Sequence, residues 1–154
     1  MVFPYEQIIT FSLGLIGTVL GLLNTYRSII KDTLKIKVIP KCVTPVGRFD
    51  PRINIAIEVI NLSTFPFTLS EVGFTLKNTN KRACIIIPIT IDGTKLPCRL
   101  EPRAAITIYG ILDDITAINI KKAYALTACG CTHEGTSLAI KSHVKNIKNS
   151  QTKI

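Results

Sequence analysis

The sequence lacks most of the residues and patterns on which enzyme active sites depend. Its 154 residues include only two histidines, and they contain no glycine-rich phosphate loop, no G-x-S-x-G elbow and no H-E-x-x-H pair. Asp113 and Asp114 are adjacent carboxylates that could suggest acid–base chemistry. Their position before Ile115 predicts instead the start of a short helix, where negative charge is favoured. We therefore expect a protein that is not an enzyme and that uses no cofactor.

Aromatic residues are also scarce, at 6% of the chain, and tryptophan is absent. Sparse stacking side chains and the lack of an evident recognition helix argue against nucleic acid as the main partner. Internal repeats and long Gly/Ser or Pro tracts are missing, which argues against solenoids and flexible linkers. The hydrophobic share of 47% excludes a disordered chain. The length fits one domain of about 100–150 residues with a short accessory segment.

What the sequence does contain is a long apolar run near its N-terminus. No formal charge occurs from Gln7 to Tyr26, a stretch of 20 residues, and about 20 residues of helix cross a hydrocarbon core of ~30 Å. A cleaved signal peptide would carry a basic start, but Glu6 is the charged side chain there. An interfacial helix would need a charged face, and a buried helix would need a larger surrounding core. We predict a transmembrane anchor over residues 1–32, with a short juxtamembrane extension.

Charge is distributed unevenly on the two sides of this run. Residues 27–48 have a net charge of +5, because Asp32 is their one acid and their basic residues are Arg27, Lys31, Lys35, Lys37, Lys41 and Arg48. The positive-inside rule predicts a single-pass protein of the inner (cytoplasmic) membrane with its N-terminus outside and its domain in the cytoplasm. The first five basic residues are candidates for contacts with anionic membrane lipid, at about 1 kcal/mol each.

Glycines lie on one side of the predicted anchor. At about 100° per residue, Gly14, Gly17 and Gly21 fall within one narrow stripe, and the last two form a G-x-x-x-G motif. Such a stripe allows two helices to approach closely in lipid, which predicts a homo-oligomer through the transmembrane helix. The alternative is that a lone span simply tolerates these glycines.

Beyond the anchor, apolar and polar residues alternate with the period of strands. The predicted strands cover residues 34–40, where Pro40 would end the strand, and residues 53–59, 67–76, 83–91, 104–109, 121–129 and 136–141, with a bulge near Ser70. About seven short strands with little helix between them predict an all-β fold, an antiparallel sandwich of immunoglobulin type. We place it at residues 33–142, followed by a basic, flexible tail at residues 143–154.

Several short motifs also resemble bacterial, membrane-anchored immunoglobulin-like β-sandwich proteins over roughly residues 33–142. They are Glu58-Val59-Ile60-Asn61-Leu62-Ser63, Val72-Gly73-Phe74, Leu96-Pro97, Leu100-Glu101-Pro102 and Ala123-Tyr124-Ala125. The resemblance implies that the Asn61 turn closes the second strand and that the Leu-Glu-Pro stretch leads into the fifth. The sequence departs from the immunoglobulin pattern because it lacks the core tryptophan and an evident pair of cysteines between the sheets. Because this fold carries many functions, the resemblance indicates fold alone.

The five cysteines are an odd number in a chain too large to need a disulfide framework, so we expect reduced thiols. Cys129, Cys131 and His133 are weak candidates for a metal site. A structural zinc site takes four ligands, and no fourth is identifiable from the sequence. We therefore predict a turn with incidental cysteines and no bound metal.

Together these features predict a membrane-anchored β-sandwich that acts as a non-catalytic binding or scaffold module at the cytoplasmic membrane face. Its predicted partners are membrane lipid and a protein that the sequence does not identify. Two alternatives stay open: the same domain on the outer side of the membrane, where the cysteines could pair, and a membrane-tethered nucleic-acid-binding module.

Overall fold

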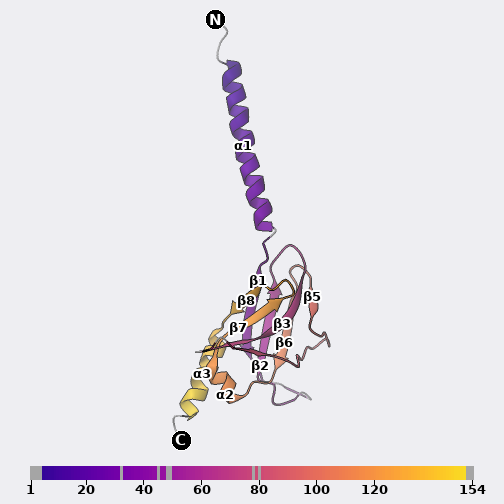
Figure 1. Cartoon of the computed structure of the whole chain (residues 1–154), viewed down its shortest axis with the longest axis vertical. Helices are drawn as coiled ribbons and strands as arrows, with labels where there is room; N and C mark the ends of the chain where they lie inside the picture. The colour runs from indigo at the N-terminus through magenta and orange to yellow at the C-terminus, as the bar shows by residue number, and fades with distance from the viewer. Residues whose placement is uncertain are drawn as a thin grey trace. The chain divides into compact units, whose positions relative to one another are not determined.

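The computed structural model describes residues 5–31, 33–44, 46, 47, 50–77, 79 and 81–151. The chain divides into two compact units, residues 1–34 and residues 35–154 (Figure 1). Arg48 and Asp32 lie outside the described residues, as do the side chains of Lys31 and Asp114.

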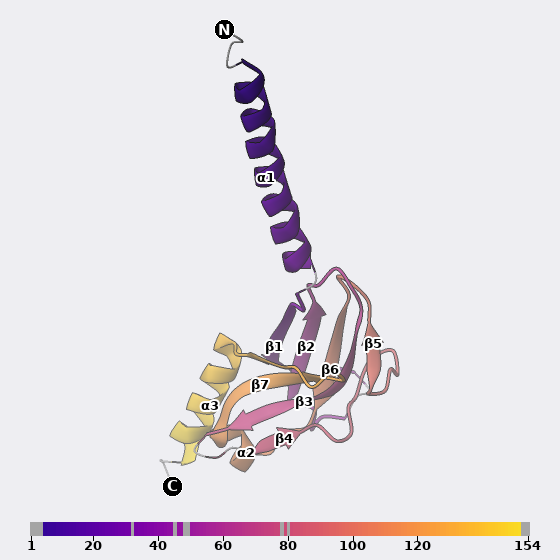
Figure 2. The same ribbon diagram turned by 45° about the horizontal axis from the view of Figure 1, so that its top comes forward.

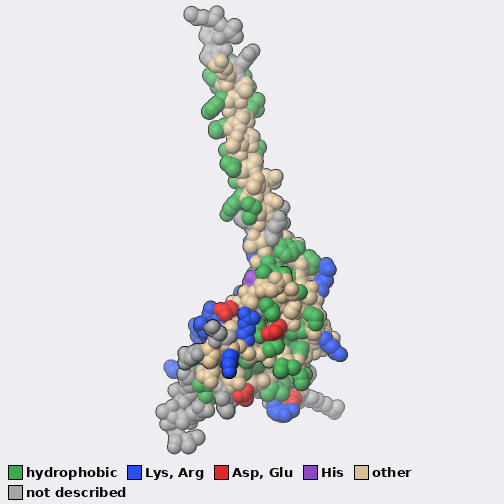
Figure 3. Space-filling model, in the orientation of Figure 1, with side chains coloured by type: hydrophobic (Ala, Val, Ile, Leu, Met, Phe, Trp, Pro, Cys, Tyr) green, Lys and Arg blue, Asp and Glu red, His purple; other side chains and the backbone are tan. Residues whose placement is uncertain are grey.

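The first unit is built by one helix, α1 (Tyr5–Lys31). Its segment Gln7–Ile29 is long and apolar enough to cross a membrane, judged by length and composition. Figure 3 shows hydrophobic side chains along the whole visible side of this helix, and none of the segment is buried. The hydroxyls of Thr18 and Thr25 donate to the carbonyls of Gly14 and Gly21, at 2.8 and 2.9 Å. These polar groups are thus satisfied within the helix, as an apolar solvent requires.

The second unit is mostly β-structure. Its described part contains eight strands, β1 (Ile36–Cys42), β2 (Ile55–Asn61), β3 (Phe67–Leu76), β4 (Arg82–Cys84), β5 (Cys98–Leu100), β6 (Ala105–Gly110), β7 (Ile120–Thr127) and β8 (Thr132–Gly135). They form a three-stranded sheet in the order β1-β2-β6 and a five-stranded sheet in the order β4-β3-β7-β8, in which β5 also pairs with β3 (Figure 2). All pairs are antiparallel.

The core draws apolar side chains from both sheets. Ile57 and Val59 of β2 are fully buried, as are Leu69 and Val72 of β3. The sheets also approach each other at β1 and β8, where a Cβ on Gly135 would collide with the carbonyl oxygen of Val38. Glycine is therefore required at this position.

Two helices complete the unit. In α2 (Asp114–Asn119), the side chain of Asp113 caps the first turn by accepting from the Thr116 amide at 2.9 Å. In α3 (Leu138–Gln151), Ile140 and Val144 are buried, and α3 packs against α2 and β1. Ser137, just before α3, donates its hydroxyl hydrogen to the Pro40 carbonyl at 2.5 Å.

The coarse prediction is confirmed: a β-rich, antiparallel chain with one apolar N-terminal helix. The bulge near Ser70 is confirmed by a register shift between Leu69 and Glu71. Strand β1, however, runs through Pro40 to Cys42. This is possible because β1 is an edge strand, where proline deprives no neighbour of an amide donor.

Three further predictions are wrong or only partly right, two of them near the C-terminus. Residues 136–141 do not form a strand, and the expected flexible tail over 143–154 is helical as far as Gln151. The apolar residues Ile140, Val144 and Ile147 recur with helical spacing, and the first two are buried. In addition, residues 83–91 form a strand only as far as Cys84, with one isolated bridge at Ile89.

The chain enters the second unit beside a tightly bonded turn. Asn61 is fully buried, and its amide group donates to the carbonyls of Phe65 and Leu100 at 2.9 and 3.0 Å. Its side-chain oxygen accepts from the Ser63 amide at 2.9 Å. Lys35 joins this turn, because its amide donates to the Ser63 hydroxyl at 2.7 Å. The first residue of the second unit is thus hydrogen-bonded to the turn that follows β2.

Candidate functional site

Five large aliphatic side chains form an exposed apolar surface on the domain. They come from three separate segments: the loop after β1, the connection from β4 to β5, and the residue after β6. Their exposed fractions are Val46 86%, Ile86 86%, Ile87 80%, Ile91 81% and Ile111 53%. We call these five residues the apolar surface. Contiguous exposed apolar residues of this kind mark interaction sites on soluble domains.

Two hollows make the apolar surface concave, and Ile89 lines both of them. The smaller, of about 300 Å³, is also lined by Val46 and Ile91. The larger, of about 610 Å³, is also lined by Ile87 and Ile111. Ile89 therefore lies between the two hollows and contributes to the lining of both.

The backbone holds these isoleucines in place. The amide of Ile85 donates to the Val72 carbonyl at 3.0 Å, which extends the pairing of β4 by one bond. Four residues later, Ile89 and Tyr109 exchange two backbone hydrogen bonds, at 3.1 and 2.7 Å. Because Ile86 and Ile87 lie between these two attachments, their exposure is built into the fold. From the sequence alone this apolar run suggested a strand, and only Pro88 signalled an interruption.

The carboxylates that line the larger hollow accept hydrogen bonds from other groups of the chain. Asp50 accepts from the Arg52 guanidinium at 2.8 Å and from the Arg52 amide at 2.9 Å. These hydrogen bonds from Arg52 lower the pKa of Asp50 to about 2. The second carboxylate on this hollow is that of Asp113, which caps α2. The hollow is therefore lined mainly by apolar atoms, with its carboxylates held by internal donors.

A second cluster, around Tyr124, is structural. Tyr124 is fully buried, and its hydroxyl donates to the Glu71 carboxylate on the neighbouring strand. The Arg82 guanidinium lies 5.2 Å from the centre of the ring. Burial, followed by the bond to Glu71, raises the pKa of Tyr124, and burial also raises that of Cys84. The raised pKa makes both groups weaker nucleophiles at neutral pH, and the bond from Tyr124 to Glu71 joins β7 to β3.

Cys129 and Cys131 flank Gly130 in the turn between β7 and β8, and both are exposed. His133 follows on β8, where it pairs with Ala125. Among the described residues, no three His, Cys, Asp or Glu side chains gather as a metal-binding group. The weak metal candidates therefore lie near one another in sequence without forming a ligand set.

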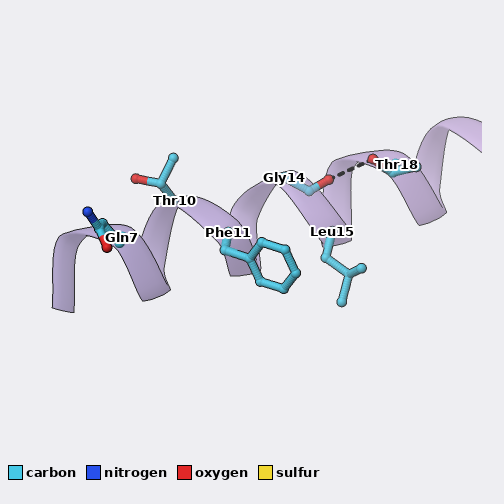
Figure 4. A pocket seen from close by; sticks show the side chains of 6 residues that line it. All are labelled: Gln7, Thr10, Phe11, Gly14, Leu15 and Thr18. Atoms are coloured by element: carbon cyan, nitrogen blue, oxygen red, sulfur yellow. Dashed lines mark hydrogen bonds between the residues drawn. The ribbon is translucent and has the colours of Figure 1, made fainter. Parts of the chain in front are cut away.

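The glycine stripe of α1 presents open backbone. A Cβ added at Gly14, Gly17 or Gly21 would meet no atom within 4 Å. Figure 4 shows the residues around the hollow at Gly14: the ring of Phe11 and the side chain of Leu15 lie on one side of the helix, and Thr10 lies on the other. Among the described residues, nothing covers these three glycines.

The predicted lipid-contact residues fall into two groups. Arg27 and Lys31 belong to α1, and the side chain of Lys31 lies outside those described. Lys35 and Lys37 are exposed at the start of β1. Lys41 differs, because its ammonium pairs with the Glu58 carboxylate at 3.0 Å. That pairing leaves Lys41 a weaker candidate for anionic headgroups than Lys35 and Lys37.

Comparisons with known proteins add little to this description. No protein-family model and no curated protein matches the chain. Among solved structures, a chain titled "X-ray structure of Northeast Structural Genomics Consortium target SoR45" shares 13% identity and a TM-score of 0.28, covering 69% of this chain and 83% of that chain. At this TM-score the likeness does not establish a shared fold, and the resemblance to immunoglobulin-like modules stays a prediction.

Proposed function

We propose that the chain is a membrane-anchored, non-catalytic binding module whose apolar surface docks an aliphatic segment of a protein partner. The observation that carries this proposal is the exposure of Ile86, Ile87 and Ile91, of which the first two lie between two backbone attachments. Burying one such side chain stabilises a complex by about 1.5–3 kcal/mol before the costs of association. We therefore place the centre of the interface at Ile86 and Ile87 on the larger hollow and at Ile91 on the smaller one.

The position of the apolar surface favours a protein partner over the bilayer. The anchor enters the domain at Lys35, next to the end of β2, whereas Ile111 and Val46 flank the opposite end, where Ile55 pairs with Gly110. A seven-residue strand separates the two ends by about 20 Å. We therefore infer that these side chains, at the other end of β2 from the chain entry, meet a protein partner.

Membrane placement follows from α1 and from the charges beside it. We place α1 across the inner (cytoplasmic) membrane, with the N-terminus outside and the domain in the cytoplasm, because the basic residues follow the span. Lys35 and Lys37 are exposed at the entry to the domain, where contacts with anionic headgroups would orient it. Free thiols at all five cysteines are compatible with this compartment.

The strand order also supports an immunoglobulin-like sandwich. In that fold, strands A, B and E share one sheet, and C, F and G share the other. The orders β1-β2-β6 and β3-β7-β8 fit this arrangement when strands are taken in chain order. The pairing of β5 with β3, in place of an edge on the first sheet, departs from it.

The experiment places a photo-crosslinking amino acid at Ile86 of the full-length protein in its native membrane. We expect a discrete crosslink to one protein, and we expect Ile91→Glu in the same chain to abolish it. Leu62→Glu is the matched control, because Leu62 is an exposed leucine at the entry end of the domain. Equal crosslinking by the two glutamate variants would contradict the proposal.

Other crosslinked products would point to other occupants. Lipid adducts alone would assign the surface to the bilayer, and a crosslink to a second copy would make it a self-interface. The outer-side alternative predicts a native disulfide, so the redox state of Cys84 and Cys98 in freshly lysed cells tests the compartment. The nucleic-acid alternative predicts salt-dependent DNA or RNA binding by the full chain.

A further inference from the structure

The five cysteines differ sharply in their surroundings. The Cys42 thiol donates to the Ala139 carbonyl at 3.6 Å, and burial raises its pKa. Burial also raises the pKa of Cys84 and Cys98, and nearby carboxylates add to both effects. Thiols with a raised pKa are poor nucleophiles because the thiolate is the reactive form. These three thiols are therefore weaker nucleophiles at neutral pH than an ordinary cysteine.

The remaining two thiols lie together in the turn between β7 and β8. The Thr127 amide donates to the Cys131 carbonyl at 3.0 Å and closes the turn, and Gly130 has a φ of +84° that favours glycine. The Thr127 hydroxyl lies 3.1 Å from the Cys129 sulfur. The same hydroxyl donates to the Cys131 carbonyl and accepts from the Cys131 amide, both at 3.1 Å. Two exposed thiols are thus held one residue apart in a closed backbone loop.

We propose that Cys129 and Cys131 form a redox-active dithiol that exchanges with disulfides of low-molecular-weight thiols. The Cys129 thiolate attacks one sulfur of the small disulfide, forming a mixed disulfide and releasing one small thiolate. Cys131 then loses its proton and attacks the Cys129 sulfur, expelling the second small thiolate. The two protein thiols are oxidised to one disulfide, the small disulfide is reduced to two thiols, and the two protein protons end on those thiols.

The surroundings assign different roles to the two sulfurs. The pKa of Cys129 is lowered by its contact with the Thr127 hydroxyl and then by its contacts with Cys131, whereas the contact with the Cys129 thiol and then its charge raise the pKa of Cys131. These opposite directions are the ones that the proposal requires, with Cys129 as the attacking thiol and Cys131 as the resolving one. Cysteines separated by one residue in a turn fall within the short span that a disulfide needs.

The test uses the reduced full-length protein in detergent, incubated with oxidised glutathione, quenched in acid and analysed by peptide mass spectrometry. In the parent protein we expect an internal Cys129–Cys131 disulfide that dithiothreitol reverses. In Cys131→Ser we expect one glutathione to accumulate on Cys129, about ten-fold faster than on Cys98. Cys98→Ser is the control and should leave the internal disulfide unchanged.

Either of two results would overturn the proposal. One is a parent protein in which both cysteines carry separate glutathiones and no internal disulfide forms. The other is modification of Cys129 in Cys131→Ser at the rate seen for Cys98. Because both cysteines are exposed, serine at either position leaves the core intact, and loss of exchange cannot be attributed to unfolding.

Discussion

Helix α1 and the apolar surface both expose large aliphatic side chains, but they do so in different ways. In α1 the exposed residues occur on every side, from Ile8 to Ile29, with no buried face. On the domain they occur together, around Ile89, beside a core in which Ile57 and Phe74 are buried. A helix that is apolar all round needs an apolar solvent, whereas a one-sided apolar surface needs one partner.

The largest expected effect separates the core from the apolar surface. Phe74→Ala should lower the free energy of unfolding by about 3–5 kcal/mol, because it leaves a cavity at a buried site. Ile86→Ala should change it by less than about 0.5 kcal/mol, since that side chain contributes little to the isolated fold. Urea unfolding of the full-length protein in detergent, followed by far-ultraviolet circular dichroism, measures both. A cost of several kcal/mol for Ile86→Ala would show that this isoleucine is a core residue.

The next effect concerns the solvent of α1. Leu15→Arg should weaken membrane insertion by about 2.5–3.5 kcal/mol, the cost of a charged side chain at the centre of a span. Leu15→Ile is the matched control and should insert like the parent. The measurement is the fraction of full-length chain that stays with membranes after an alkaline carbonate wash. If the carbonate wash releases the parent protein from the membranes, α1 does not span them, and the contrast between α1 and the apolar surface is wrong.

The sequence predicted the elements whose signal is local. The uncharged run from Gln7 to Tyr26 predicts most of α1 by its length, and the apolar residues Ile55, Ile57 and Val59 at every second position predict β2. The parity shift at Ser70 located a bulge, because one extra residue reverses the faces of a strand. Asp113 was correctly placed at a helix start, because its carboxylate accepts the amide that the first turn leaves free.

The features that were missed depend on contacts between distant residues. Helix α3 is fixed by packing of Ile140 and Val144 on the domain, and its many lysines suggested a solvated tail. The exposure of Ile86 and Ile87 results from the backbone bridge between Ile89 and Tyr109, which periodicity cannot reveal. A run of apolar residues has the same sequence pattern whether its side chains are buried or exposed to solvent. The candidate site was therefore the least predictable part of the chain.

The smallest expected effect concerns how α1 contacts another helix in lipid. There is no hydrophobic gain when apolar side chains leave lipid for each other, so association depends on close packing. Gly17 and Gly21 leave open backbone on one face, where an added Cβ meets no atom within 4 Å in this chain. If two copies pair through this face, a bulky side chain there would hold the backbones apart.

We expect Gly17→Ile or Gly21→Ile to weaken pairing about ten-fold, or ~1.4 kcal/mol. Leu15→Ile should pair like the parent in the same two-hybrid measurement of the isolated span in a membrane. Equal association of the glycine variants and the parent would make α1 a monomeric anchor, and the domain would then meet its partner without a second copy beside it.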